Sequence, residues 1–377
     1  METSESRQQK LRNIWNAAIA AVSGRQAVLN ALAEDDPFTP DLIVAVGKAA
    51  AGMCEGALQQ YPGCEALVVT KYEHTDQSLR AQAGVEVIES AHPIPDQHSL
   101  DAGRALLVRM RSMPEGSRVL MLVSGGASAL AEALPEDMTL ADLQAMTDDM
   151  IATGKTIAQI NARRKQTSLI KGGKLIEAFP GDEIRVYAIS DVEGDGIETI
   201  GSGIGDCCRA EARASSRIIA SNRIAREQAV RQAEQLGLKV HVNEETLYGD
   251  VFELAPVIGA RLQQAETGVY IWGGEPTVVL PENPGRGGRN QSLALALAEY
   301  ASGMDNIDFL VAGTDGTDGP TSAAGGIVNG NTWSDPAAAR AALRAADAGS
   351  YLERHQSLFV TGPTNTNVMD LVIAIVS

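Results

Sequence analysis

Short apolar runs alternate with helical segments along most of the chain. The runs Leu42–Val46, Arg118–Val123 and Ile307–Ala312 have the length and composition of buried strands. Strands that alternate with helices favour α/β layers, so we predict largely parallel sheets. One exception is expected at Val269–Leu280, whose pattern is that of a β-hairpin turning at Gly273–Glu275. With 377 residues, and roughly 150 residues per domain, the chain is long enough for two domains.

The charge balance argues against several classes of partner. The 31 basic and 48 acidic residues give a net charge of −17, which disfavours nucleic acid and anionic membranes. No apolar run has the length of a membrane span, and the segment METSESRQQKLR lacks the apolar core of a secretory signal. The four cysteines show no metal-ligand spacing, and we interpret them as reduced thiols of a cytoplasmic protein.

The loop Gly313–Gly326, with the sequence GTDGTDGPTSAAGG, directly follows a predicted buried strand. It is too polar and too rich in glycine for a core element, and glycine lets the backbone approach a ligand closely. Asp315 and Asp318 offer hard oxygen ligands to a cation. A flexible surface loop is the alternative. We favour a ligand-binding loop, because α/β proteins place ligands after their parallel strands.

Three further polar turns each follow an apolar strand: Gly47–Lys48, Ser124–Gly126 and the loop that begins at Asp191. A glycine and serine turn before a helix presents backbone N–H groups to an anion, so SGGAS could be a phosphate cradle or simply a tight turn. Lys48 can neutralise a phosphate or carboxylate, or it can be an exposed lysine at a helix start. The sequence contains no GxxxxGK[ST] motif and therefore no P-loop.

Single charged residues give weaker signals. Arg289 stands among glycines in GRGGRNQ, where its guanidinium could bind an anion. Asp191 could bind magnesium, act as a base or cap the next turn, and Glu275 in WGGEPT is similar. The five histidines have no ligand spacing with one another, and we expect most of them at the surface.

Taken together, the motifs resemble those of the glycerate 2-kinase family, whose C-terminal part is called the MOFRL domain. The matching segments occur in order over nearly the whole chain. They are VGKAAAGM, SGGASAL, NARRKQTSLIKGGK, ISDVEGD with IGSG, IASN, GGEPTV, GGRNQSLALALA, GTDGTDGPTSAAGG and GPTNTNVMDL.

The resemblance implies ATP-dependent phosphorylation of D-glycerate at its 2-hydroxyl, which gives 2-phosphoglycerate. It also implies a Rossmann-like α/β domain over residues 1–238, an α/β MOFRL-type domain over 239–377, and an active-site cleft between them. Carried over by motif, the catalytic residues are Lys48, Asp191, Arg289 and Asp315. The nucleotide phosphates would lie on Ser124, Gly125, Gly126, Ala127 and Ser128, and Mg²⁺ would be held by Asp191 and Asp315.

The sequence leaves two other functions open. A hydroxypyruvate reductase would need a strand–GxGxxG–helix unit followed by an acidic residue, and we find none in the sequence. A non-catalytic ligand-binding protein on the same scaffold is disfavoured by the presence of Lys48, Asp191, Arg289 and Asp315. The oligomeric state is not determined by the sequence, and a homodimer stays open.

Overall fold

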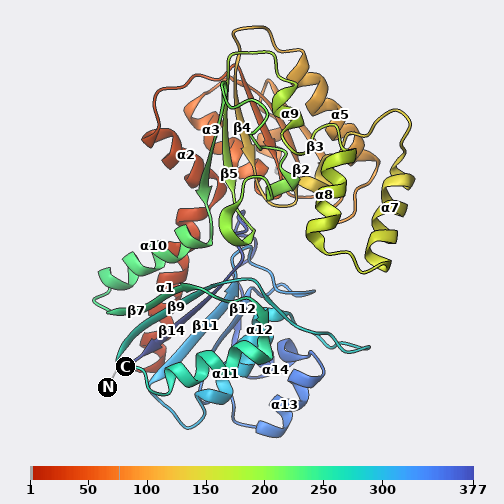
Figure 1. Cartoon of the computed structure of the whole chain (residues 1–377). Helices are drawn as coiled ribbons and strands as arrows, with labels where there is room; N and C mark the ends of the chain where they lie inside the picture. Colours follow the sequence, from red (N-terminus) through yellow and green to blue (C-terminus); the bar gives the residue numbers. More distant parts are fainter. Residues whose placement is uncertain (1–2, 76) are drawn as a thin grey trace. The chain divides into compact units, whose positions relative to one another are not determined.

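The computed structural model describes residues 3–75 and 77–377 and divides into two compact units (Figure 1). The inserted unit comprises Ser23–Ser221, and the terminal unit comprises Met1–Val22 together with Asn222–Ser377. These boundaries differ from the expected division at residues 238 and 239. The N-terminal helix and the helix that begins at Asn222 both pack on the C-terminal sheet, so they belong to the terminal unit.

The inserted unit contains a six-stranded sheet with the order β3-β2-β1-β4-β5-β6. All five strand pairings are parallel, as predicted. This is the order of a doubly wound sheet, in which ligands bind at the carboxyl ends of the two strands where the order reverses. Those strands are β1 and β4. The strand bounds are β1 Leu42–Val46, β2 Glu65–Lys71, β3 Val85–Ser90, β4 Arg118–Val123, β5 Glu183–Ile189 and β6 Ala214–Ala220.

Helices cover this sheet, and one core lies between the sheet and α5. Alternate strand residues such as Leu42, Val44 and Val46 join that core, because successive side chains of a strand point to opposite faces. The helices of the unit are α2 Gly24–Glu34, α3 Ala50–Gln60, α4 Gln77–Arg80, α5 Gln97–Arg111, α6 Ala127–Leu130, α7 Leu140–Ala152, α8 Ile157–Thr167 and α9 Lys174–Glu177, with 3₁₀ turns η1 Glu193–Asp195 and η2 Ile200–Ser202.

The terminal unit has a six-stranded sheet with the order β13-β12-β11-β14-β9-β7, and it is mainly antiparallel. Only β7 and β9 pair in parallel, which differs from the parallel sheet expected here. The physical reason is the connection: β11 and β12 are joined by a loop, and parallel neighbours need a longer crossover. The strand bounds are β7 Val240–Glu245, β9 Gly268–Gly274, β11 Ile307–Gly313, β12 Gly325–Asn329, β13 Leu358–Phe359 and β14 Asp370–Val376.

The predicted hairpin at Val269–Leu280 is absent from the structure of these residues. Strand β9 runs on to Gly274, and the short β10 Pro276–Thr277 leaves the sheet to pair with β8 Gly249–Asp250. Gly274 has a φ of 138°, so the chain can change direction there without a Cβ clash. The glycines therefore redirect the chain, and they do not reverse it.

The helices of the terminal unit lie on both faces of its sheet. One core joins alternate residues of β9, β11 and β14 to α11, α12, α13 and α14, while α1 and α10 contact the sheet outside that core. The N-terminal helix is fixed by a buried ion pair, in which Arg7 Nε donates to Asp308 at 2.6 Å. The helix bounds are α1 Ser4–Val22, α10 Asn222–Gln235, α11 Val251–Leu262, α12 Arg289–Tyr300, α13 Pro336–Arg344 and α14 Ala348–Arg354. No helix in the described part of the chain has the length and apolar character needed to cross a membrane.

Candidate functional site

The first group of candidate residues lies where the strand order of the inserted unit reverses. Gly47 and Lys48 follow β1, and Ser124 follows the neighbouring strand β4. The two turns are joined by backbone and side-chain hydrogen bonds: Lys48 N donates to Gly125 O at 2.9 Å, and Ala49 N donates to Ser124 Oγ at 3.0 Å. A Cβ atom on Gly47 would overlap Ser124, which explains the glycine.

The loop Ser124–Ser128 has the backbone expected of an anion cradle. Gly126 is left-handed, with φ 83°, and turns the chain into the short helix α6. Among the described residues, none accepts a hydrogen bond from the N–H groups of residues 125–128. Ser124 itself is buried and holds the β1 turn, while Ser128 Oγ lies 2.8 Å from Ser202 Oγ. The two serines thus shape the loop, and its free N–H groups are available to a ligand.

Three side chains lie directly against this loop. A Cβ atom on Gly125 would overlap the carboxylate of Asp191, which follows β5. A Cβ atom on Gly126 would lie 3.1 Å from Lys48 Cγ and 3.1 Å from His92 Cδ2. The structure therefore brings Lys48, Asp191 and the loop together, and it adds His92, one of the five histidines, most of which we expected at the surface.

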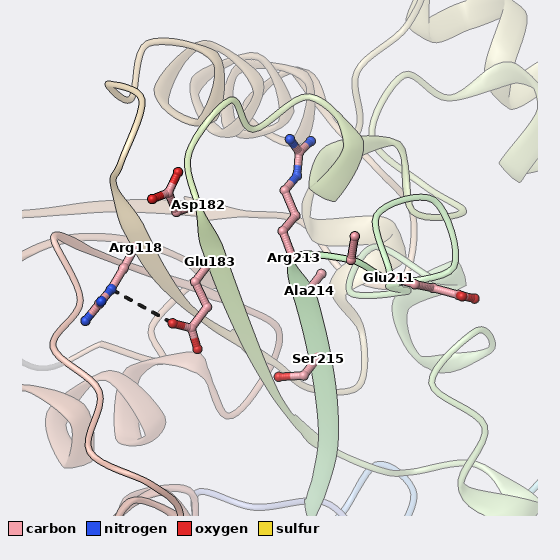
Figure 2. A pocket seen from close by; sticks show the side chains of 8 residues that line it. Arg118, Asp182, Glu183, Glu211, Arg213, Ala214 and Ser215 are labelled. Atoms are coloured by element: carbon pink, nitrogen blue, oxygen red, sulfur yellow. Dashed lines mark ion pairs between the residues drawn. The ribbon is translucent and has the colours of Figure 1, made fainter.

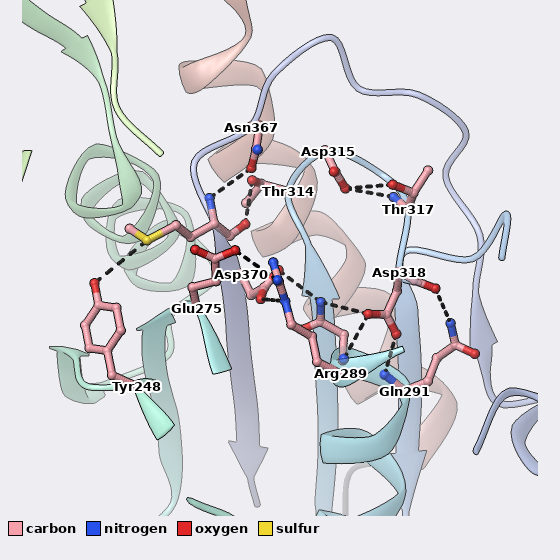
Figure 3. Close-up of polar contacts among 12 residues, drawn as sticks. Tyr248, Glu275, Arg289, Gln291, Thr314, Asp315, Thr317, Asp318, Asn367 and Asp370 are labelled. Atoms are coloured by element: carbon pink, nitrogen blue, oxygen red, sulfur yellow. Dashed lines mark hydrogen bonds and ion pairs between the residues drawn. The ribbon is translucent and has the colours of Figure 1, made fainter. Parts of the chain in front are cut away.

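The second group lies in the terminal unit and centres on Arg289, the first residue of α12 (Figure 3). Its Nε donates to Asp370 Oδ2 at 2.6 Å and its Nη2 donates to Asp370 Oδ1 at 3.3 Å. Its Nη1 donates to Glu275 Oε1 at 2.9 Å. Asn290 Nδ2 also donates to Asp370, at 2.9 Å. Asp370 thus holds the guanidinium bidentately, a geometry that fixes its plane.

Burial and charge set the ionisation of this pair. Burial lowers the pKa of Arg289, but the carboxylates of Asp370 and Glu275 raise it by more, so the net direction is upward. Burial raises the pKa of Asp370 to about 6, against the opposing effect of Arg289. The guanidinium therefore stays charged at all ordinary pH values, and Asp370 loses its charge in mild acid.

The two aspartates of the loop after β11 have different roles in the structure. Asp318 is buried and caps α12, because its carboxylate accepts from Asn290 N at 3.0 Å and from Gln291 N at 2.8 Å. Asp315 is partly exposed, and its Oδ1 accepts from Thr317 N at 2.9 Å. Asp318 is therefore a structural residue, while Asp315 keeps an accessible carboxylate.

A cavity of about 430 Å³ opens beside Arg289 within the terminal unit. Its walls come from residues 276–278, 280, 287–290, 315 and 317–320. Arg289, Asp315 and the buried Asp318 all line it, so the guanidinium and the accessible carboxylate of Asp315 border the same space. That combination suits a small anion with hydroxyl groups.

A second pocket, of about 410 Å³, lies in the inserted unit (Figure 2). Its walls include Arg118, Glu183 and Ala214, which begin β4, β5 and β6. It is therefore at the amino ends of the parallel strands, the edge opposite to Lys48. Arg118 and Glu183 form an exposed ion pair there at 3.9 Å, and none of the predicted site residues lines the pocket.

Magnesium would have to be held by few protein groups. The described residues contain no cluster of three or more His, Cys, Asp or Glu side chains placed to hold a metal ion. Mg²⁺ in phosphoryl-transfer sites commonly uses one or two carboxylates together with phosphate oxygens. Asp191, against the phosphate-cradle loop, fits this requirement.

Two site residues were missed from the sequence. His92 stands after β3 in a proline-rich connector, and only the strand order shows that this connector reaches the same sheet edge as Lys48. Asp370 begins β14 and appeared only as part of GPTNTNVMDL. A charged residue directly before the apolar run LVIAIV was the one available signal.

Two family models match the chain and together cover most of it. Residues 10–235 match a domain of unknown function (DUF4147), and residues 268–370 match the MOFRL family. The gap between the matches falls near β7 and α11.

Relatives at about one third identity extend over almost the full length. A glycerate 2-kinase of Pyrococcus horikoshii is 33% identical and covers 96% of this chain and 95% of its own. A protein of Agrobacterium vitis that bears the name of a hydroxypyruvate reductase is 32% identical and covers 97% of this chain and 94% of its own. The crystal structure of a glycerate kinase from Thermotoga maritima superimposes with a TM-score of 0.91 at 29% identity, covering 99% of this chain and 100% of that one.

The doubly wound unit, its glycine loop and these matches define a phosphotransferase of the α/β class. The chain belongs to the glycerate 2-kinase family with a MOFRL domain.

Proposed function

We propose that the protein transfers the γ-phosphoryl group of ATP to the 2-hydroxyl of D-glycerate, giving 2-phospho-D-glycerate and ADP. The observation that supports this most directly is the pairing of Lys48 with the loop Ser124–Ser128 at the reversal point of the parallel sheet. Phosphoryl transfer depends mainly on positioning and on neutralising charge. A lysine beside a loop whose N–H groups donate to no described residue can supply both for a chain of phosphates.

The proposed roles follow from the surroundings of each residue. Lys48 and residues 124–128 bind the nucleotide phosphates, and Arg289 binds an anionic group, its guanidinium fixed by Asp370. Asp191 and Asp315 share two tasks, which are to hold Mg²⁺ and to accept the proton of the 2-hydroxyl. When bound, Mg²⁺ supplies positive charge to the phosphate oxygens.

Two residues of the inserted unit argue against a nicotinamide-dependent reductase. The turn after β1 reads GKAAAG, with Ala49 at the position of the second glycine of a dinucleotide fingerprint. Strand β2 ends at Lys71, where an acidic residue would bind the ribose. Neither residue interferes with binding a triphosphate at the loop 124–128.

A coupled assay tests the proposal. The protein is mixed with MgATP and D-glycerate, and enolase is added to consume the product. We expect the coupled reaction to run without added phosphoglycerate mutase, because enolase accepts the 2-phosphate. ADP release whose coupling requires the mutase would refute the position of transfer. Absence of ADP, with NADH oxidised in the presence of hydroxypyruvate, would refute the kinase and support the reductase.

A further inference from the structure

His92 lies at the loop Ser124–Ser128 although it comes from the connector that follows β3. A Cβ atom on Gly126 would lie 3.2 Å from His92 Nε2 and 3.1 Å from Lys48 Cγ, so the two side chains flank the same glycine. Gly126 has a left-handed backbone, and a Cβ atom there would be in tight contact with both side chains. The imidazole edge and the lysine stem are thus the two side-chain walls of this part of the loop.

The backbone on both sides of His92 is fixed by the fold. Before it, Ser90 Oγ donates to Leu130 O at 2.8 Å, which ties the end of β3 to the end of α6. After it, Asp96 caps α5 and also accepts from Ala91 N at 3.4 Å. The ring itself makes no hydrogen bond to any described residue. A half-buried imidazole in a fixed position without a protein partner is available to a ligand.

The electrostatic surroundings of His92 are cationic. Burial, assisted by Lys48, Lys71 and His74, lowers its pKa to about 4. Lys71 ends β2 and Lys48 follows β1, so positive groups gather along the carboxyl ends of neighbouring strands. At neutral pH the ring is uncharged and carries one N–H donor. A neutral donor beside a lysine can bind a phosphate oxygen without adding to the repulsion between cations.

We propose that His92 is a nucleotide-binding residue, whose Nε2–H donates to a phosphate oxygen of ATP held by Lys48 and the loop 124–128. This assignment rests on the proposed kinase function, because it takes the ligand of the loop to be a nucleoside triphosphate. The side chain touches substrate and not the 2-hydroxyl, so it contributes to nucleotide affinity and leaves the affinity for glycerate unchanged.

Two substitutions separate this role from a packing role. His92→Gln keeps an N–H donor near the Nε2 position, and His92→Leu keeps a similar volume without a donor. His98→Leu, at an exposed histidine of the same unit, is the control. Binding of ATP with Mg²⁺ is measured by titration calorimetry, and KM for ATP and for D-glycerate is measured in the coupled assay. Circular dichroism establishes that each variant is folded.

We expect His92→Leu to weaken ATP binding about 10- to 100-fold, the range of a lost hydrogen bond to a charged group. His92→Gln should recover most of that loss, and KM for D-glycerate should stay within about twofold in both. Equal ATP binding by wild type and His92→Leu would overturn the proposal, as would a loss confined to D-glycerate. If the wild type binds ATP and forms no phosphoglycerate, the kinase function fails while the binding role of His92 is still decided by calorimetry.

Discussion

Removing Arg289 should expose the cost of burying Asp370, and the size of that cost can be worked out from the structure. Asp370 is 1% exposed, and its carboxylate is held by two hydrogen bonds from Arg289 and one from Asn290. Breaking a fully buried pair by removing one partner costs about 3–5 kcal/mol. Arg289 is about one third exposed and Asn290 remains, so we expect Arg289→Met to cost about 2–4 kcal/mol at pH 7.5.

The loss should depend on pH with a definite sign. Burial holds the pKa of Asp370 at about 6 in the folded protein, above its ordinary value of 3.8. Between pH 4 and 6 the folded state therefore binds the proton more tightly than the unfolded state, and the stability contributed by this group falls as pH rises. Protonated Asp370 needs no counter-ion. The destabilisation by Arg289→Met should thus be largest above pH 6 and shrink towards pH 4.

Urea unfolding followed by tryptophan fluorescence measures the stability of the terminal unit, in which Arg289 and Asp370 lie. All three tryptophans, Trp15, Trp272 and Trp333, are buried in the terminal unit, so the signal reports that unit alone. Comparing Arg289→Met, Asp370→Asn and the double variant gives the coupling free energy, which we expect to be about 1–3 kcal/mol. Additive losses within about 0.5 kcal/mol, or a loss that grows in acid, would refute the reasoning.

Three further predictions concern single residues. Lys48→Ala and Asp315→Asn should each lower turnover by orders of magnitude in the coupled assay while circular dichroism stays unchanged, and near-normal turnover would remove that residue from the site. Gly47→Ala should lower the free energy of unfolding by about 1–3 kcal/mol from backbone strain, because Gly47 has a φ of 130°. The overlap of the new Cβ atom with Ser124 adds to this loss. Calorimetry that finds no loss would contradict the prediction. The lowered pKa of His92 should make the wild type lose about 1–2 kcal/mol of stability between pH 6.5 and pH 4, after allowance for solvent screening. That loss should be absent in His92→Gln, and an unchanged pH dependence in the variant would argue against a buried neutral ring.

Local patterns predicted the elements of the inserted unit well. The strands Leu42–Val46 and Arg118–Val123 have the predicted bounds. Each of these elements is an apolar run bounded by turn residues, and the length and composition of the run are enough to identify a buried strand. Lys48 and Ser124–Ser128 could be recognised as candidate site residues from the same signal, because each directly follows a strand of this kind.

Features that depend on distant partners could not be read from local patterns. An apolar strand buried on both faces has the same composition whether its neighbours are parallel or antiparallel, so the mixed sheet of the terminal unit was not predicted. The amphipathic face of α1 shows that the helix is buried, but it does not show which sheet covers it. Asp318 and Asp315 are equivalent in sequence and both line the cavity, and only the position of α12 makes Asp318 a buried cap while Asp315 keeps an accessible carboxylate.

The packing of α1 on the terminal unit has a consequence for the protein during its synthesis. Leu11, Ile14 and Trp15 on α1 are covered by parts of the chain that come after Ser221. At about 5–20 residues per second, a ribosome needs roughly 10–40 seconds to add the intervening 200 residues or so. During that time the inserted unit can fold, while the apolar face of α1 remains exposed because α10, β11 and β14 have not yet been synthesised. The apolar face of α1 therefore begins to be covered only when α10 has been made, and its contacts are complete only when β11 and β14 have followed.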